Sequence, residues 1–253
     1  MPRYLLDFKH HIVMLVTAIL LTACGITRTP IPSLSYPGSE AAQTQSGKKL
    51  LVVLRGMGGS EKSFEKHGFI AALQKQYPEF DVVAPNAHFG YYRKRSITQR
   101  LSVDIIDPAI AVGYEEIWLA GVSLGGFGNL VYLRCCETKI TGVVLISPFS
   151  GKKNLHDDVN AYLDGKQGPP WVGTNKSEDS IMGIWRWLIE NREILGGGRV
   201  WLGYGNEDRL SGHDLLARLI PDDQVVKLSG GHKVEVFMRI WREILSRDPM
   251  SAQ

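Results

Sequence analysis

The residues best suited to chemistry are a serine, an aspartate and a histidine in the second half of the chain. Ser123 lies in the sequence Gly-Val-Ser-Leu-Gly, between a strand-like run at 117–120 and a helix-like run at 124–136. This strand–turn–helix setting is the one in which a nucleophilic serine is lifted above the end of a sheet. The two flanking glycines leave room where side chains would collide with the tight turn. By itself the motif is weak evidence, because a glycine-rich turn with an incidental serine also matches it.

A base and an orienting acid must accompany the serine, because an unassisted hydroxyl is a poor nucleophile. His232 follows a strand-like run at 225–228, and Asp208 follows another at 200–203. Both residues come at the carboxyl ends of predicted parallel strands, where the active sites of open α/β sheets gather. We therefore predict that Ser123, Asp208 and His232 form a catalytic triad.

Other assignments remain open for two members of this triad. Glu207 precedes Asp208 directly and is the rival acid, and Asp179 and Asp214 are weaker alternatives. A single histidine in a loop is also commonly a solvated surface residue. The triad is favoured because three residues fall independently into matching places along the chain.

Acyl transfer also requires hydrogen-bond donors for the developing oxyanion. The glycine-rich loop at 55–60 follows the first strand-like run and precedes a helix-like run, so it can offer backbone N–H groups. Met57 would supply one N–H group, and Leu124, directly after the serine, would supply the other.

The elements that must position these residues alternate between strand-like and helix-like runs. This alternation predicts an α/β fold with a mostly parallel sheet of about six strands and helices on both faces. A longer insertion at 150–195 predicts a small cap, and Pro108 should kink or divide a helix at 97–113. The predicted strands are 50–54, 81–84, 117–120, 142–146, 200–203 and 225–228, and the other predicted helices are 61–77, 124–136 and 233–246.

The chain resembles the α/β-hydrolase fold of the serine esterase and lipase family over residues 48–247. The motifs that carry the resemblance are the loop at 54–60, the elbow at 121–125 and the acid turn at 205–208. There are two departures: Arg55 stands where the family often has His, and no clear pair of antiparallel strands leads the sheet.

The resemblance implies hydrolysis of a carboxylic ester through an acyl-enzyme, without a cofactor, on a small-molecule or lipid ester. A thioesterase, amidase or acyltransferase with the same triad is an alternative, because the acceptor is chosen by pocket shape and water access. A non-catalytic scaffold that serves as a binding protein is another, since fold alone does not fix function.

The N-terminus resembles the signal peptide of bacterial lipoproteins. Residues 1–23 combine positive charges with a short apolar run, and Leu-Thr-Ala-Cys ends at Cys24. This run of ten residues, 12–21, is too short to span a bilayer but suits a secretory signal. The resemblance implies a lipidated Cys24 that anchors the protein to the cell envelope, at the periplasmic face of the outer membrane. Residues 24–47 have the composition of a flexible tether, and 248–253 form a C-terminal tail.

Composition excludes several other classes of protein. The 253 residues include 29 Lys and Arg against 26 Asp and Glu, a net charge of +3 that does not predict nucleic-acid binding. His67, His88, His156 and His213 lie on different segments without the spacing of metal ligands, so no metal site is predicted. Cys135 and Cys136 are interpreted as small apolar residues on a helix.

Overall fold

A computed structural model describes residues 26–172 and 181–251, and the structural statements that follow concern these ranges. The signal peptide, Cys24 and Asp179 therefore lie outside the described residues.

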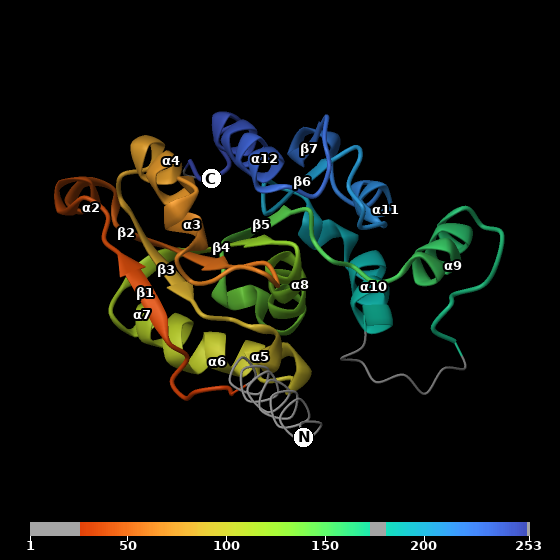
Figure 1. The fold of residues 1–253 in the computed structure, drawn as a ribbon, viewed down its shortest axis with the longest axis horizontal. Coiled ribbons are helices and arrows are strands. Elements are labelled where there is room, and N and C mark those ends of the chain that lie inside the picture. The colour runs from red at the N-terminus through yellow and green to blue at the C-terminus, as the bar shows by residue number, and fades with distance from the viewer. Residues whose placement is uncertain (1–25, 173–180, 252–253) are drawn as a thin grey trace, which may run out of the picture.

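A seven-stranded sheet runs through the centre of the protein in the order β1-β3-β2-β4-β5-β6-β7 (Figure 1). All neighbouring strands are parallel except β1, which pairs antiparallel with β3 at the edge. Because the parallel strands share one direction, their carboxyl ends meet along one edge of the sheet. The strands are β1 (Ser33–Tyr36), β2 (Lys48–Leu54), β3 (Phe80–Pro85), β4 (Tyr114–Val122), β5 (Gly142–Ile146), β6 (Val200–Gly205) and β7 (Val225–Leu228).

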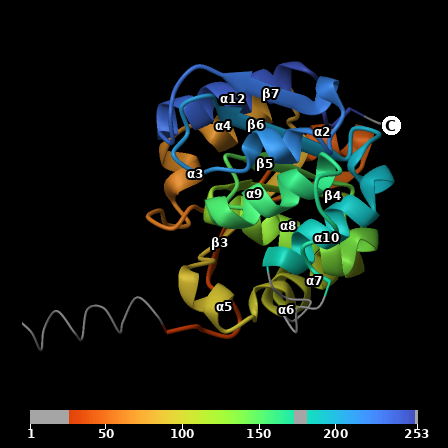
Figure 2. The same cartoon turned by 90° about the vertical axis from the view of Figure 1, so that its right-hand side faces the viewer.

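Helices cover both faces of this sheet (Figures 1 and 2). Helices α3, α4 and α12 pack on one face, and α6 to α8 and α10 on the other. The α-helices are α2 (Glu40–Ser46), α3 (Ser63–Lys66), α4 (Phe69–Gln76), α5 (Phe89–Arg93), α6 (Ile97–Leu101), α7 (Asp107–Ala111), α8 (Leu124–Cys136), α9 (Lys153–Leu163), α10 (Ile181–Glu190), α11 (His213–Ala217) and α12 (Val234–Ser246). A π-helical segment, η1 (Ser102–Ile106), and three short 3-10 helices, η2 (Glu137–Lys139), η3 (Arg192–Leu195) and η4 (Asp222–Gln224), complete the elements.

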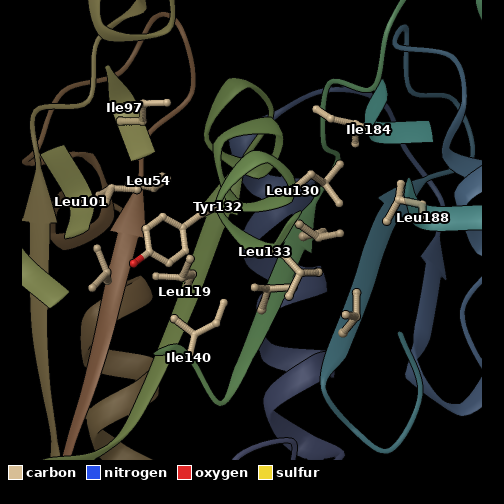
Figure 3. Close-up of a cluster of buried hydrophobic side chains, with 14 of the residues drawn as sticks. Leu54, Ile97, Leu101, Leu119, Leu130, Tyr132, Leu133, Ile140, Ile184 and Leu188 are labelled. Atoms are coloured by element: carbon tan, nitrogen blue, oxygen red, sulfur yellow. The ribbon is translucent and has the colours of Figure 1, made fainter. Parts of the chain in front are cut away.

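The core is divided by the sheet into two layers, because successive side chains of a strand point to opposite faces. In β5, Val143 and Leu145 enter the layer beneath α8, whereas Val144 and Ile146 enter the layer beneath α12. Figure 3 shows the first layer, in which Leu119 of β4 lies with Leu130 and Leu133 of α8. Every residue of β5 is buried, as the continuous apolar run predicts.

The expectation of a flexible tether up to residue 47 is wrong for its described part. Residues Ser33–Tyr36 form β1, a strand that was not among the six predicted, and α2 begins shortly after it at Glu40. Upstream of β1 the backbone is held by side chains of the domain. The Tyr91 hydroxyl accepts a hydrogen bond from the Arg28 N–H at 2.9 Å and donates one to the Arg28 carbonyl at 3.0 Å. The domain therefore begins near Ile26 rather than at residue 48.

Three helical predictions need correction. The run at 61–77 is two helices, separated at Gly68, whose φ of 79° lies in the left-handed region. The run at 97–111 stays helical around Pro108, because the π-helical segment η1 precedes it and the proline falls in the first turn of α7, where a missing N–H is tolerated. Cys135 and Cys136 end α8 and are joined by a disulfide, so they are not two separate apolar side chains.

The predicted insertion lies between β5 and β6 and contains α9, α10 and η3. Helix α10 packs against α8, with Ile184, Trp185 and Leu188 buried. The C-terminal segment is also packed on the domain: Met250 is buried, and Tyr77 donates a hydrogen bond to Asp248 at 2.5 Å. Within the described residues, no helix has both the length and the apolar character needed to cross a bilayer.

Candidate active site

Ser123 sits on a sharp turn between β4 and α8, with a φ of 56° and a ψ of −112°. An L-residue rarely adopts a positive φ, so neighbouring groups must hold the backbone there. The Ser123 N–H donates to the Ile146 carbonyl at 2.9 Å. The Ser123 carbonyl accepts from the N–H groups of Phe127 at 3.1 Å and Phe149 at 3.0 Å. The turn is therefore fixed to β5 and to the loop that follows it.

The two glycines of the motif are required by close backbone approach. A Cβ atom at Gly121 would lie 2.4 Å from the Gly125 carbonyl carbon, and one at Gly125 would lie 1.9 Å from the Leu54 carbonyl oxygen. Both distances are far below van der Waals contact. The strand, the turn and the end of β2 can approach this closely because neither residue has a side chain.

The structure brings Ser123, His232 and Asp208 together in one hydrogen-bonded chain. His232 Nε2 lies 3.0 Å from Ser123 Oγ, and His232 Nδ1 lies 2.9 and 3.0 Å from the two Asp208 carboxylate oxygens. The side chain of Asp208 is 1% exposed and that of His232 is 10% exposed. A carboxylate beside Nδ1 favours a proton on that nitrogen and leaves Nε2 free to accept the serine proton.

Asp208 remains ionised in spite of its burial. Desolvation acts to raise the pKa of Asp208, but hydrogen bonds from His232 and from the Leu210 N–H outweigh it and hold this pKa below its usual value. Ser147 Oγ is buried close to the same carboxylate but makes no hydrogen bond of normal geometry. A permanent negative charge is therefore available to stabilise a protonated His232.

The loops that carry Asp208 and His232 are bonded to each other. The Glu207 N–H donates to the Gly230 carbonyl at 2.9 Å, and the Asn206 N–H donates to the Leu228 carbonyl at 2.8 Å. These bonds fix the spacing between the carboxyl ends of β6 and β7, from which the acid and the base extend.

The other candidate acids do not reach the histidine. Glu207 is exposed and forms only the backbone contact just described. Asp214 accepts hydrogen bonds from Tyr204 and Lys227, each at 2.6 Å. Of the described acids that the sequence offers, Asp208 is the one that meets His232.

The loop after β2 lies beside the serine and is held by Arg55, which is 8% exposed. The Arg55 guanidinium donates to the carbonyls of Gly56 at 3.3 Å and Met57 at 3.2 Å, and to that of Gly59. In a planar trans peptide the carbonyl and the following N–H point in opposite directions. By binding the Gly56 carbonyl, Arg55 therefore turns the Met57 N–H away from itself.

The second predicted donor belongs to Leu124, the first residue of α8. The N–H of the first helical residue has no acceptor within its own helix, so it is available to an external oxygen. Arg55, which stands where the serine esterase and lipase family often has His, supports the oxyanion loop through its bonds to the loop carbonyls.

A cavity of about 280 Å³ opens in front of Ser123 and His232. Met57 and the neighbouring glycines line it, together with the aromatic rings of Phe64, Phe69 and Phe237. Within the described ranges, no residue of the insertion at 150–195 lines this cavity, and its helix α10 packs on α8.

The polar groups of the site suit acyl transfer to a serine. They include a nucleophile, a base and an acid in hydrogen-bond contact, with backbone donors next to the nucleophile. Among the described residues, no group of three His, Cys, Asp or Glu side chains could hold a metal ion.

Several of the solved structures similar to this chain are serine hydrolases and esterases. The serine hydrolase FphF of Staphylococcus aureus superposes with a TM-score of 0.59 at 17% identity, over 88% of this chain and 95% of that one. The S-formylglutathione hydrolase FrmB of the same organism gives 0.58 at 17% identity, over 86% and 98%. A ferulic acid esterase gives 0.55 at 15% identity, over 85% and 96%. No protein-family model and no curated protein matches the sequence.

The chain therefore has the α/β-hydrolase fold, as the resemblance of its motifs implied. The sheet has one strand more than the six that were predicted, because β1 adds an antiparallel edge.

Proposed function

We propose that this protein is a serine esterase that cleaves a carboxylic ester through an acyl-enzyme. The observation that carries the proposal is the unbroken chain of hydrogen bonds from Ser123 through His232 to the buried Asp208. The similar structures support a hydrolase of this class. The reaction needs no cofactor, because the nucleophile, the base and the oxyanion donors are all protein groups.

In the first half of the reaction, Ser123 Oγ attacks the ester carbonyl carbon while His232 Nε2 takes the hydroxyl proton. The N–H groups of Met57 and Leu124 bind the oxyanion of the tetrahedral intermediate. His232 then gives its proton to the departing alkoxide, the C–O bond breaks, and the acyl group remains on Ser123. Asp208 holds the imidazole in the required tautomer throughout.

In the second half, a water molecule takes the place of the alcohol. His232 Nε2 removes a proton from this water as its oxygen attacks the acyl carbon. The intermediate collapses, the proton returns to Ser123 Oγ, and the carboxylic acid leaves. The cycle restores each group to its starting protonation state.

A fluorophosphonate probe tests the proposal directly. The probe should label the protein at Ser123, and Ser123→Ala should lose both labelling and 4-nitrophenyl acetate hydrolysis. Ser246→Ala is a matched control, because that serine lies exposed at the end of α12. Labelling that persists in Ser123→Ala, or that maps to Ser60 or Ser147, contradicts the assignment. A folded wild-type protein that neither binds the probe nor turns over an ester supports the non-catalytic alternative.

We also propose that Cys24 is acylated and anchors the protein to the bacterial envelope, at the periplasmic face of the outer membrane. The support is the Leu-Thr-Ala-Cys sequence after a short apolar run. The full chain should fractionate with membranes and resist high-salt washing, because salt screens charges but does not weaken apolar burial. Residues 25–253 behind an ordinary secretory signal should instead be soluble and active. If the full chain is released by salt alone, the anchor is not a lipid.

A further inference from the structure

The cavity in front of Ser123 carries positive charge without a balancing carboxylate. Arg55 and Arg209 both line it, and none of the described lining residues is Asp or Glu. The rest of the wall is largely apolar, and Phe64, Phe69 and Phe237 contribute three rings. A cationic group beside a largely apolar cavity favours an anionic ligand, because no carboxylate among the described lining residues competes for it.

The two arginines have different roles in this cavity. Arg55 is buried, and its guanidinium is engaged with the carbonyls of the loop after β2. Arg209 is exposed and makes no hydrogen bond or ion pair with any described residue. Other arginines of the chain, such as Arg100 with Asp104 and Arg186 with Glu190, are paired with a carboxylate. Arg209 therefore keeps its donors available to a ligand.

The position of Arg209 is fixed by the same bonds that place the triad acid. Its neighbour Asp208 donates its backbone N–H to the Gly205 carbonyl at 3.1 Å, and the Asp208 carboxylate accepts from the Leu210 N–H at 2.9 Å. The residues on both sides of Arg209 are thus tied down. The arginine has a defined backbone position at the edge of the catalytic cavity, whereas an arginine on a helix surface such as Arg242 faces solvent.

We infer that Arg209 binds a carboxylate group of the substrate, so that the enzyme prefers small esters that carry a second, ionised carboxyl group. This inference rests on the proposed esterase function. The planar guanidinium can hold a carboxylate through two parallel hydrogen bonds, which orients the ester as well as binding it. A cavity of about 280 Å³ limits the group beside Ser123 to a small one.

Matched esters measure this preference with the full-length protein. The neutral substrate is 4-nitrophenyl butyrate. Mono-4-nitrophenyl glutarate places a carboxylate on the acyl side and is compared with this ester. On the alcohol side, 4-acetoxybenzoate carries the carboxylate and is compared with the neutral 4-acetoxybenzamide. Wild type should have a higher kcat/KM for one carboxylate ester than for its neutral counterpart, and the favoured arm identifies the side that faces Arg209. A wild-type preference for the neutral ester over both overturns the inference.

The variants Arg209→Gln, Arg209→Lys and Arg242→Gln assign the preference to its residue. The ratio of kcat/KM for the carboxylate ester to that for the neutral ester should fall about 10- to 100-fold in Arg209→Gln, mainly through KM. Arg209→Lys should retain part of the ratio, and the control Arg242→Gln should retain all of it. An unchanged ratio in Arg209→Gln, including equal losses on both esters, overturns the inference.

A binding measurement separates this inference from the proposed function. Monomethyl glutarate is titrated calorimetrically into Ser123→Ala and into Ser123→Ala with Arg209→Gln, so no turnover is needed. The half-ester should bind the single variant with a Kd about 10- to 100-fold lower than that of the double variant, and added salt should weaken it. Equal or absent binding overturns the inference even if ester hydrolysis at Ser123 is established. Loss of hydrolysis with intact binding contradicts only the esterase proposal.

Discussion

Replacement of Gly125 by alanine should damage both the stability and the catalytic geometry of this protein. The new Cβ would lie 1.9 Å from the Leu54 oxygen, 2.4 Å from the Leu54 carbonyl carbon and 2.9 Å from the Arg55 oxygen. These are backbone atoms at the end of β2, which cannot rotate away. To reach even 3.0 Å from the Leu54 oxygen, the backbone must move by about 1.1 Å.

The size of the effect follows from that displacement. Overpacking of a tight interior contact costs about 1–3 kcal/mol or more. For a domain of this size, each kcal/mol lowers Tm by about 2–4 °C, so Gly125→Ala should melt roughly 2–12 °C below wild type. A misplacement of about 1 Å between Ser123 and the loop at 55–59 should also reduce kcat by about 10²-fold.

Thermal unfolding and the hydrolysis of 4-nitrophenyl acetate measure the two effects on one preparation. Gly168→Ala is the matched control, because a Cβ at Gly168 meets nothing within 4 Å and the residue lies outside the catalytic cavity. This control should keep the wild-type Tm and kcat. A Gly125→Ala protein with wild-type Tm and kcat would refute the claim that the end of β2 and the serine turn are in rigid contact.

Further predictions concern the acid, the oxyanion loop and pH. Asp208→Asn should fold normally but lose about 10³- to 10⁴-fold in kcat, whereas Glu207→Gln should stay within threefold; the reverse ranking would make Glu207 the acid. Arg55→Met should reduce kcat by about 10²- to 10³-fold through the loss of one oxyanion donor, and unchanged single-turnover kinetics would contradict that role. Burial lowers the pKa of His156 and His213, so below a pH of about 6.5 the unfolded chain binds more protons than the folded one. Tm should therefore fall as the pH is lowered from 7 to 5. A Tm that rises as the pH is lowered would contradict the lowered pKa of these two histidines.

The triad could be predicted from the sequence because local patterns determine its placement. The serine lies in a motif whose glycines are demanded by contacts such as that between Gly125 and Leu54. The acid and the base each follow a short run that forms a parallel strand: β6 is fully buried, and β7 lies at the edge of the sheet. The order of the three residues along the chain and their positions at the ends of strands were sufficient to predict that Asp208 contacts His232.

The features that were missed depend on contacts between distant parts of the chain. Strand β1 has the sequence Ser-Leu-Ser-Tyr, which lies in a stretch rich in Pro and Ser and has little strand signal of its own. It forms because its backbone pairs with β3, for example Leu34 opposite Ala84. The role of Arg55 was also hidden, since its three carbonyl partners become neighbours only when the glycine-rich loop folds back.

The packing of the N-terminal segment sets how far an anchored enzyme could move from its membrane. A free chain of 23 residues between Cys24 and β2 would extend up to about 80 Å and let the domain turn in any direction. The segment is already bound to the domain at Arg28, and the Ile26 carbonyl lies 3.3 Å from His88 Nε2. Only the two peptide units between Cys24 and Ile26 remain, a reach of about 7 Å. With acyl chains on Cys24, the side of the domain that carries His88 and α5 would therefore be held close to the bilayer surface.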